Sequence, residues 1–259
     1  YPVLSGEVVK HVGDAVAFVV ADDLNSAKSA AELIEVDYDT LPAVTDTAGA
    51  LQPGAPLVWP DRGSNLAFES EIGDKAATAA VFASAANIVE ITVVNNRLVC
   101  NYMEPRAIVA EYDQASGRHT VTIGSQGVHG MRDAMCKVLK IDPKEMRVLT
   151  YDVGGGFGTK TFNYREYPLA VKAAKALGRP VKWVSDRNEH FVADAHGRDN
   201  VTTGAFALDA DGRIRAMRVE LIAAMGSYFN QFGPYIPTIG LTMLTGLYDI
   251  PTVYASCKA

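Results

Sequence analysis

The stretch that most constrains this chain is residues 152–160, where four of the five positions from 154 to 158 are glycine. An apolar run at residues 146–151 precedes the loop and predicts a strand. Residues 164–177 follow it with the periodicity of a helix, which Gly178 closes. A glycine loop between a strand and a helix is a recurring way to present backbone N–H groups to an anion. Because glycine has no Cβ, we expect a ligand to approach the main chain closely here.

Three interpretations of this loop compete. A Walker A loop requires a glycine directly before its lysine, but Thr159 separates Gly158 from Lys160. A dinucleotide-binding fingerprint requires a glycine three positions after Gly156, and Thr159 occupies that position instead. A glycine-rich turn without any ligand stays open when the loop is considered alone.

The composition indicates a soluble globular protein. The 259 residues are enough for one large or two ordinary domains, and 48% are hydrophobic while 21% are charged. A net charge of −6 argues against a general nucleic-acid or anionic-membrane binder. No apolar stretch reaches transmembrane length, and the first residues do not resemble a signal peptide.

The cysteine and histidine patterns do not favour a protein-held metal. Cys100, Cys136 and Cys257 are an odd number without CxxC spacing, so we expect neither a disulfide framework nor a structural zinc site. The same usage favours a reducing compartment. Five scattered histidines include no i,i+4 pair on a predicted helix, which argues against a histidine metal site.

The chain divides into a short first unit, a linker and a longer second domain. Strands at 7–13, 15–20 and 35–39 with a helix at 26–34 predict a ββαβ unit of about 45 residues, near the lower limit for independent folding. Residues 45–73 carry turn signals without periodicity, and Trp59 and Phe68 suggest that this linker is pinned to a surface.

The second domain alternates strands and helices from about residue 76. We predict helices at 77–86 and 128–139, single strands at 87–94 and 181–184, and hairpins formed by 107–112 with 119–123 and by 201–208 with 214–224. Residues 226–251, rich in glycine, proline and aromatics, have no clear assignment.

The loop and its flanks together resemble the molybdenum hydroxylases, which include the xanthine dehydrogenases, aldehyde oxidases and aerobic carbon monoxide dehydrogenases. Residues 153–160, Val-Gly-Gly-Gly-Phe-Gly-Thr-Lys, are similar to the family's molybdopterin-cofactor loop. Further segments match in the same order: residues 7–44, similar to the second half of the hammerhead domain, and residues 101–106, 123–126 and 181–189.

The resemblance implies an α+β fold. We expect a partial hammerhead domain of ββαβ form at residues 1–50, a linker at 51–75, and at 76–259 the first part of the mixed α/β molybdopterin-binding domain. The chain begins without an initiator methionine and ends just after a predicted strand. We therefore expect it to be an N-terminal portion of the large subunit.

The resemblance also implies the cofactor contacts. In this family the dithiolene sulfurs of the pterin hold the metal, and the protein supplies surrounding contacts. Gly155, Gly156, Phe157 and Gly158 are then expected to place backbone groups beside the metal's oxo ligand. Gln126 is expected to hydrogen-bond that oxo group or a cofactor phosphate, since an amide donates without adding charge. The alternative for Gln126 is an ordinary amide at a strand end.

Two charged residues have open roles. Arg198 aligns with an arginine that faces substrate in some relatives, where it would pair with an anionic or carbonyl oxygen. The alternative is a loop arginine paired with Asp199 or Asp194. Glu104 either orients the glycine loop or has a surface or capping role.

The sequence also departs from parts of the family. Purine-hydroxylating members carry a glutamate at the position of Thr161, which argues against xanthine as substrate, and residues 164–170 look more like the carbon monoxide dehydrogenase-like branch. The resemblance places the general base and the diagnostic cysteine loop beyond residue 259. We therefore expect no catalytic residue in this chain and no turnover by it alone, and we assign Cys257 no role.

The parent protein implied by the resemblance is a cytoplasmic oxidoreductase. It would use a molybdenum–molybdopterin cofactor, in the cytosine dinucleotide form, to oxidise a small substrate with oxygen derived from water. Electrons would pass to an iron–sulfur small subunit and an FAD medium subunit, in a dimer of heterotrimers without nucleic acid. The alternative is a non-catalytic binding or scaffold domain that keeps the fold without the cofactor.

Overall fold

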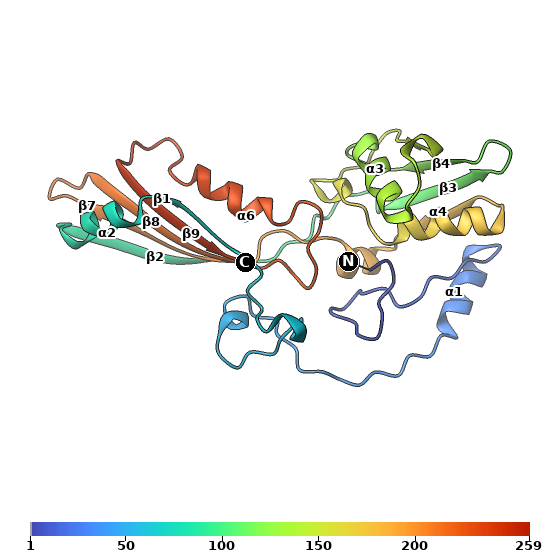
Figure 1. The fold of residues 1–259 in the computed structure, drawn as a ribbon, viewed down its shortest axis with the longest axis horizontal. Helices are drawn as coiled ribbons and strands as arrows, with labels where there is room; N and C mark the ends of the chain where they lie inside the picture. The colour runs from blue at the N-terminus through green and yellow to red at the C-terminus, as the bar shows by residue number, and fades with distance from the viewer. Residues whose placement is uncertain (1) are drawn as a thin grey trace. The chain divides into compact units, whose positions relative to one another are not determined.

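The structure, a computed structural model, describes residues 2–259. They form two compact units (Figure 1). Of the described residues, the first unit combines 2–40 with 99–196, and the second combines 41–98 with 197–259. Each contains one mixed β-sheet with helices packed on it, so the mixed α/β architecture is confirmed.

The first unit is built on a four-stranded sheet. Its central strands form the predicted hairpin, in which Ile108 lies opposite Ile123. The pair formed by residues 118–123 and 146–149 is parallel, and the other two pairs are antiparallel. In spatial order the strands are β5 (Met146–Leu149), β4 (Arg118–Ile123), β3 (Ala107–Asp113) and β6 (Val181–Val184).

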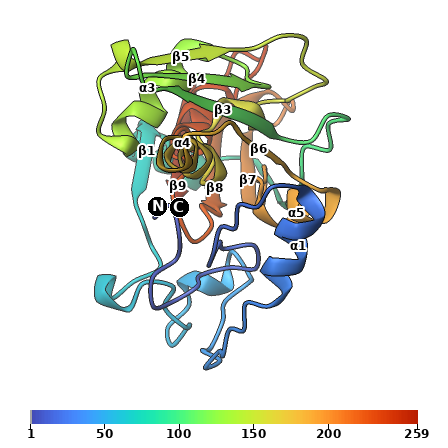
Figure 2. The same ribbon diagram turned by 90° about the vertical axis from the view of Figure 1, so that its right-hand side faces the viewer.

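Two helices, α3 (Val128–Leu139) and α4 (Glu166–Leu177), pack against this sheet (Figure 2). Met131 and Met135, one helical turn apart in α3, are buried in the same core as Tyr167 of α4. Helix α4 ends at Gly178, whose φ of 62° is the left-handed conformation that stops a helix. The bounds predicted for α3 are confirmed.

The strands predicted before residue 40 are wrong. Within residues 2–42 the structure contains helix α1 (Leu24–Glu32), capped by Asp23, but no strand. A strand needs a neighbouring strand for its backbone hydrogen bonds. Residues 2–40 are instead held to the rest of the first unit by side chains. Phe18 packs against the core, Asp14 pairs with Arg165, and Asp22 pairs with Arg179.

The second unit is built on a five-stranded sheet. The pair β8·β9 is parallel and the other three pairs are antiparallel. The predicted hairpin around Asp209 and Gly212 is confirmed as β7·β8. In spatial order the strands are β1 (Glu69–Gly73), β9 (Thr252–Lys258), β8 (Ile214–Ala223), β7 (Asn200–Leu208) and β2 (Asn87–Asn95).

Short helices cover both faces of this sheet. On one face Phe82 of α2 (Lys75–Ala83) packs against Ala205 and Ala216. On the other face Leu241 packs against Met217, where α6 (Tyr235–Gly240) leads into the 3₁₀ turn η5 (Leu241–Met243). These two elements lie in the segment that the sequence left unassigned.

The predicted linker is pinned, as expected. The indole N–H of Trp59 donates to the carbonyl of Ser227 at 2.8 Å, and Phe68 packs against the core of the second unit. Its last residues, however, form strand β1 on β9, which the sequence did not predict. The remaining short elements are α5 (Arg187–Ala193), η1 (Gly49–Leu51), η2 (Pro60–Arg62), η3 (Pro143–Glu145) and η4 (Thr159–Thr161).

Candidate functional site

The glycine loop leaves strand β5 and enters helix α4 through the 3₁₀ turn η4. Gly155 and Gly158 have φ angles of 91° and 94°, conformations that only glycine adopts readily. Phe157, between them, has φ 48°, and its side chain is 73% exposed. A bulky residue held in the left-handed region is locally strained, and such strain is common at ligand-binding loops.

The inner side of the loop is filled by the protein's own side chains. A Cβ on Gly154 would lie 2.5 Å from the Cβ of Glu104, and one on Gly156 would lie 2.5 Å from Oε1 of Gln126. Both distances are far inside van der Waals contact. The close approach that we expected these two glycines to permit for a ligand is therefore made by Glu104 and Gln126.

Gln126 is bound to the loop through one end of its amide. Its Oε1 accepts a hydrogen bond of 2.9 Å from the Gly158 N–H, and its own backbone N–H donates to the carbonyl of Lys160 at 3.2 Å. The side chain is exposed. Within residues 2–259 its Nε2 has no hydrogen-bond partner, so this donor is available to a ligand oxygen.

Three successive backbone N–H groups of the loop are also free. In the described part of the chain, the N–H groups of Gly155, Gly156 and Phe157 make no hydrogen bond. Those of Gly154 and Gly158, on either side, are taken by Glu104 and Gln126. The tip of the loop thus presents three adjacent unpaired donors.

Glu104 and Lys160 form an ion pair beneath the loop. The Nζ atom of Lys160 lies 2.6 Å from Oε2 of Glu104 and 4.7 Å from the centroid of the Tyr102 ring. Burial alone would raise the pKa of Glu104, but hydrogen bonds from Lys160 and Gly154 outweigh it and hold that pKa below its usual value. Glu104 is thus bound both to the loop at Gly154 and to Lys160, and the orienting role considered for it stays a prediction.

A buried polar network supports this arrangement. Nε of Arg106 lies 2.6 Å from Oδ1 of Asp194, and Nη1 of Arg106 lies 3.0 Å from Glu166. Tyr102 donates to the same Asp194 carboxylate, which also contacts Nδ1 of His190 at 2.8 Å. Burial would lower the pKa of Arg106, but the two carboxylates raise it overall, so the guanidinium stays charged.

Sequence reasoning did not find this network. Residues 101–106 were singled out for Glu104, whereas Arg106 and Tyr102 in the same segment received no role. Asp194 was considered only as a partner for Arg198. No local signal identifies the partner of Arg106, because Asp194 lies 88 residues away in the sequence.

Cys100 also touches the loop. Its thiol donates to the carbonyl of Phe157 over 3.5 Å, and the side chain is partly exposed. The other two thiols, Cys136 and Cys257, are buried in the two cores, where burial raises the pKa of each. The structure thus gives Cys257 a packing role.

Arg198 belongs to the second unit, whereas the loop and Gln126 belong to the first. It is exposed, has φ 69°, and within residues 2–259 its side chain makes no ion pair or hydrogen bond. Asp199 pairs instead with Arg97 at 3.3 Å, and Asp194 pairs with Arg106. Neither alternative partner holds Arg198, so its role as a substrate-facing residue stays a prediction.

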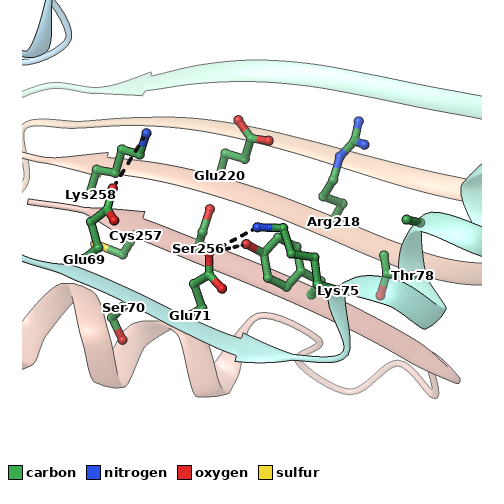
Figure 3. A pocket seen from close by; sticks show the side chains of 12 residues that line it. Glu69, Ser70, Glu71, Lys75, Thr78, Arg218, Glu220, Ser256, Cys257 and Lys258 are labelled. Atoms are coloured by element: carbon green, nitrogen blue, oxygen red, sulfur yellow. Dashed lines mark hydrogen bonds and ion pairs between the residues drawn. The ribbon is translucent and has the colours of Figure 1, made fainter.

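A hollow of about 420 Å³ lies on the α2 face of the second unit (Figure 3). Its charges largely compensate one another, because Glu71 pairs with Lys75 at 3.4 Å and Glu69 with Lys258 at 3.8 Å. None of the site residues predicted from the sequence lines it.

The loop tip offers several uncharged donors close together. Three free N–H groups and one amide Nε2 suit an oxo or phosphate oxygen rather than a cation. In the described residues no group of three His, Cys, Asp or Glu side chains is placed to hold a metal ion. Among the same residues, no helix has both the length and the apolar character needed to cross a membrane.

Comparison with known proteins also indicates a cofactor-binding domain. Residues 58–259 match the molybdopterin cofactor-binding domain, and residues 1–42 match the a/b hammerhead domain of aldehyde oxidase and xanthine dehydrogenase. In structure, the chain is similar to quinoline 2-oxidoreductase from Pseudomonas putida 86, with a TM-score of 0.92 and 31% identity. That match covers 100% of this chain and 33% of the other.

Two curated relatives have the same level of similarity. The carbon monoxide dehydrogenase large chain of Hydrogenophaga pseudoflava is 36% identical, over 99% of this chain and 35% of that protein. The 6-hydroxypseudooxynicotine dehydrogenase complex subunit gamma of Paenarthrobacter nicotinovorans is also 36% identical, over 100% of this chain and 32% of that protein. The chain spans about a third of the length of these relatives.

Proposed function

This chain belongs to the family of molybdopterin cofactor-binding domains, and we propose that its loop at residues 154–158 and Gln126 contact that cofactor. The observation that carries the proposal is the set of free donors at the loop tip, which comprises the N–H groups of Gly155, Gly156 and Phe157 and Nε2 of Gln126. Family membership supplies the ligand, and these donors fit its oxygens.

Each residue has a distinct task in this proposal. Gln126 is fixed through Oε1, so its Nε2 is already oriented when an oxo or phosphate oxygen arrives. The backbone N–H groups add donors without introducing charge. When bound, the cofactor supplies the redox chemistry by which oxygen from water is transferred to a substrate.

The parent protein proposed here is the large subunit of a molybdenum-dependent hydroxylase. The resemblance to carbon monoxide dehydrogenase large chains and to a subunit of a dehydrogenase complex supports a multi-subunit oxidoreductase. The finer proposals are the cytosine dinucleotide form of the cofactor, partner subunits carrying iron–sulfur clusters and FAD, a dimer of heterotrimers, and a cytoplasmic location. Arg198 is proposed to face substrate.

Within the chain, the proposed boundaries remain a hammerhead part at residues 1–50, a linker at 51–75 and the cofactor-binding part at 76–259. The two family matches support a change of domain between residues 42 and 58.

Metal analysis of the full-length protein, purified with its partners, tests the proposal. We expect molybdenum in the wild type and less of it in Gln126→Glu, because a carboxylate would face the cofactor's negative oxygens. Gln114→Glu, an exposed glutamine in the β3–β4 turn, is the matched control and should keep the wild-type metal content. A wild-type protein without molybdenum, or full occupancy in Gln126→Glu, would overturn the proposal.

A further inference from the structure

We propose that Glu104 is a positioning residue of the cofactor site: its carboxylate, which contacts both Gly154 and the buried Lys160, sets the loop conformation that cofactor binding requires. The inference deepens the proposed function and rests on it for the identity of the ligand. The contacts of Glu104 with Gly154 and Lys160, called the clamp below, lie within the first unit.

A single oxygen atom bridges the two ends of the loop. Oε2 of Glu104 accepts a hydrogen bond of 2.9 Å from the N–H of Gly154 and one of 2.6 Å from Nζ of Lys160. Gly154 begins the glycine segment, and Lys160 lies two residues after its last glycine, Gly158. A bridge between them fixes the span across which the free N–H groups are held.

A second contact makes the attachment of Gly154 reciprocal. The backbone N–H of Glu104 donates to the carbonyl of Gly154 at 3.1 Å. The backbone N–H and C=O of Gly154 are therefore both bound to Glu104. The absence of a Cβ at position 154 lets these two backbone segments lie this close. This part of the loop has no room to move independently of Glu104.

Because Lys160 is buried, its ammonium group depends on the negative charge of Glu104. The lysine side chain is fully buried, whereas that of Glu104 is 41% exposed. An ammonium ion removed from water needs a compensating charge, and Glu104 is the carboxylate that contacts it. Removing the negative charge would leave Lys160 uncompensated directly below the loop.

The position of Glu104 is set from outside the loop. Arg187, at the start of α5, donates to Oδ1 of Asn101 at 2.9 Å and to the carbonyls of Tyr102 and Met103 at 3.0 and 3.1 Å. These contacts fix the turn that precedes Glu104. The loop therefore follows Glu104, and the free donors at its tip are pre-organised before any ligand arrives.

Amide hydrogen exchange of the 259-residue chain tests the clamp without any cofactor. In Glu104→Gln we expect exchange of the Gly154 and Gly158 amides to rise by about tenfold or more, while the amides of Ile108 and Val121 in the sheet stay protected. Glu111→Gln, an exposed glutamate on β3, is the matched control and should leave all four unchanged. Unchanged protection of Gly154 in Glu104→Gln would overturn the proposal.

A second variant separates loss of charge from general damage. Lys160→Met removes the buried cation, so the double variant Glu104→Gln with Lys160→Met contains no uncompensated charge. We expect its melting temperature to lie closer to the wild type than the two single effects combined predict. Additive effects would show that the charges are not coupled and would also overturn the proposal.

A third experiment tests cofactor binding and uses the full-length protein with its partners. We expect Glu104→Gln to retain less molybdenum after gel filtration than Glu111→Gln, and the metal that it retains to give an altered Mo(V) electron paramagnetic resonance spectrum. A wild-type metal content and spectrum in Glu104→Gln would overturn the positioning role. A wild type without molybdenum would instead overturn the proposed function, while the exchange result would still decide whether the clamp exists.

Discussion

Arg106 and Asp194 form an ion pair in which neither side chain is exposed, with Nε of the arginine 2.6 Å from Oδ1 of the aspartate. The guanidinium also lies 3.7 Å from the centroid of the Tyr164 ring and contacts Glu166. Arg106 precedes β3, Asp194 ends α5 and Glu166 begins α4. One buried cation therefore joins three elements of the first unit.

Replacing this cation should destabilise the first unit strongly. In Arg106→Met the carboxylates of Asp194 and Glu166 lose their buried counter-charge, which typically costs about 3–5 kcal/mol. Urea unfolding followed by tryptophan fluorescence measures the loss, because the Trp183 ring lies 5.1 Å from the guanidinium. Arg147→Met, at an exposed position on β5, should stay within about 0.5 kcal/mol of the wild type. A loss below about 1 kcal/mol in Arg106→Met would contradict this account.

A methyl group at position 156 should strain the loop through one contact. Gly156→Ala places its Cβ 2.5 Å from Oε1 of Gln126, and we expect a loss of about 1–3 kcal/mol in the same unfolding measurement. The three atoms nearest that Cβ all belong to the Gln126 side chain beyond its own Cβ. The same substitution in a Gln126→Ala background should therefore be nearly neutral.

The control for this prediction is a substitution that should raise the stability instead of lowering it. Gly130 lies within helix α3, and a Cβ there would meet no atom within 4 Å. Gly130→Ala should therefore stabilise the chain by roughly 0.5–1 kcal/mol through its helix propensity. An equal cost of Gly156→Ala with and without Gln126 would show that the contact is not the cause.

Sequence patterns predicted the elements whose signals are local. Helix α3 has its apolar positions one turn apart, and the β7–β8 hairpin has its own turn at Asp209 and Gly212, so each was predicted without knowledge of the rest of the chain. Strand β1 was missed because its partner is β9, where Ser70 lies opposite Cys257. This strand has only five residues, Glu-Ser-Glu-Ile-Gly, and one of them is apolar. Its sequence therefore carries no alternation of apolar and polar residues that would separate it from a linker.

The same limit applies to the site. The glycine loop was recognisable, because its composition restricts the backbone by itself. What fills its inner side was not, since Glu104 and Gln126 lie 50 and 32 residues from the loop amides they bind. The meaning of Gly154 and Gly156 accordingly changed from space for a ligand to space for these side chains.

Glu189 should make the stability of the first unit fall as pH rises. Burial and the neighbouring Glu166 carboxylate raise the pKa of Glu189 to about 7, whereas Arg106 opposes the shift and Asp186 adds to it. The folded protein then binds a proton that the unfolded chain releases near pH 4.3. This contribution is fully present below that pH and is lost as the pH rises through about 7.

Glu189→Gln should remove that dependence, because an amide is neutral at every pH. Urea unfolding at pH 5 and pH 8 measures it, and we expect the variant to gain about 1–3 kcal/mol over the wild type at pH 8 but little at pH 5. Glu111→Gln, exposed on β3, should follow the wild type at both values. A gain of equal size at the two pH values would mean that packing, not ionisation, is responsible.

Cys100 should be the one thiol of three that reacts in the folded chain. It is partly exposed beside Phe157, whereas Cys136 and Cys257 are buried and burial raises the pKa of both. Since the thiolate is the reactive form, a disulfide reagent such as DTNB should modify one thiol quickly in native chain and all three after denaturation. Cys100→Ser should abolish the fast phase, and Cys257→Ser should leave it intact. Fast modification of two or more thiols in the folded chain would show that at least one of the two cores is open to solvent.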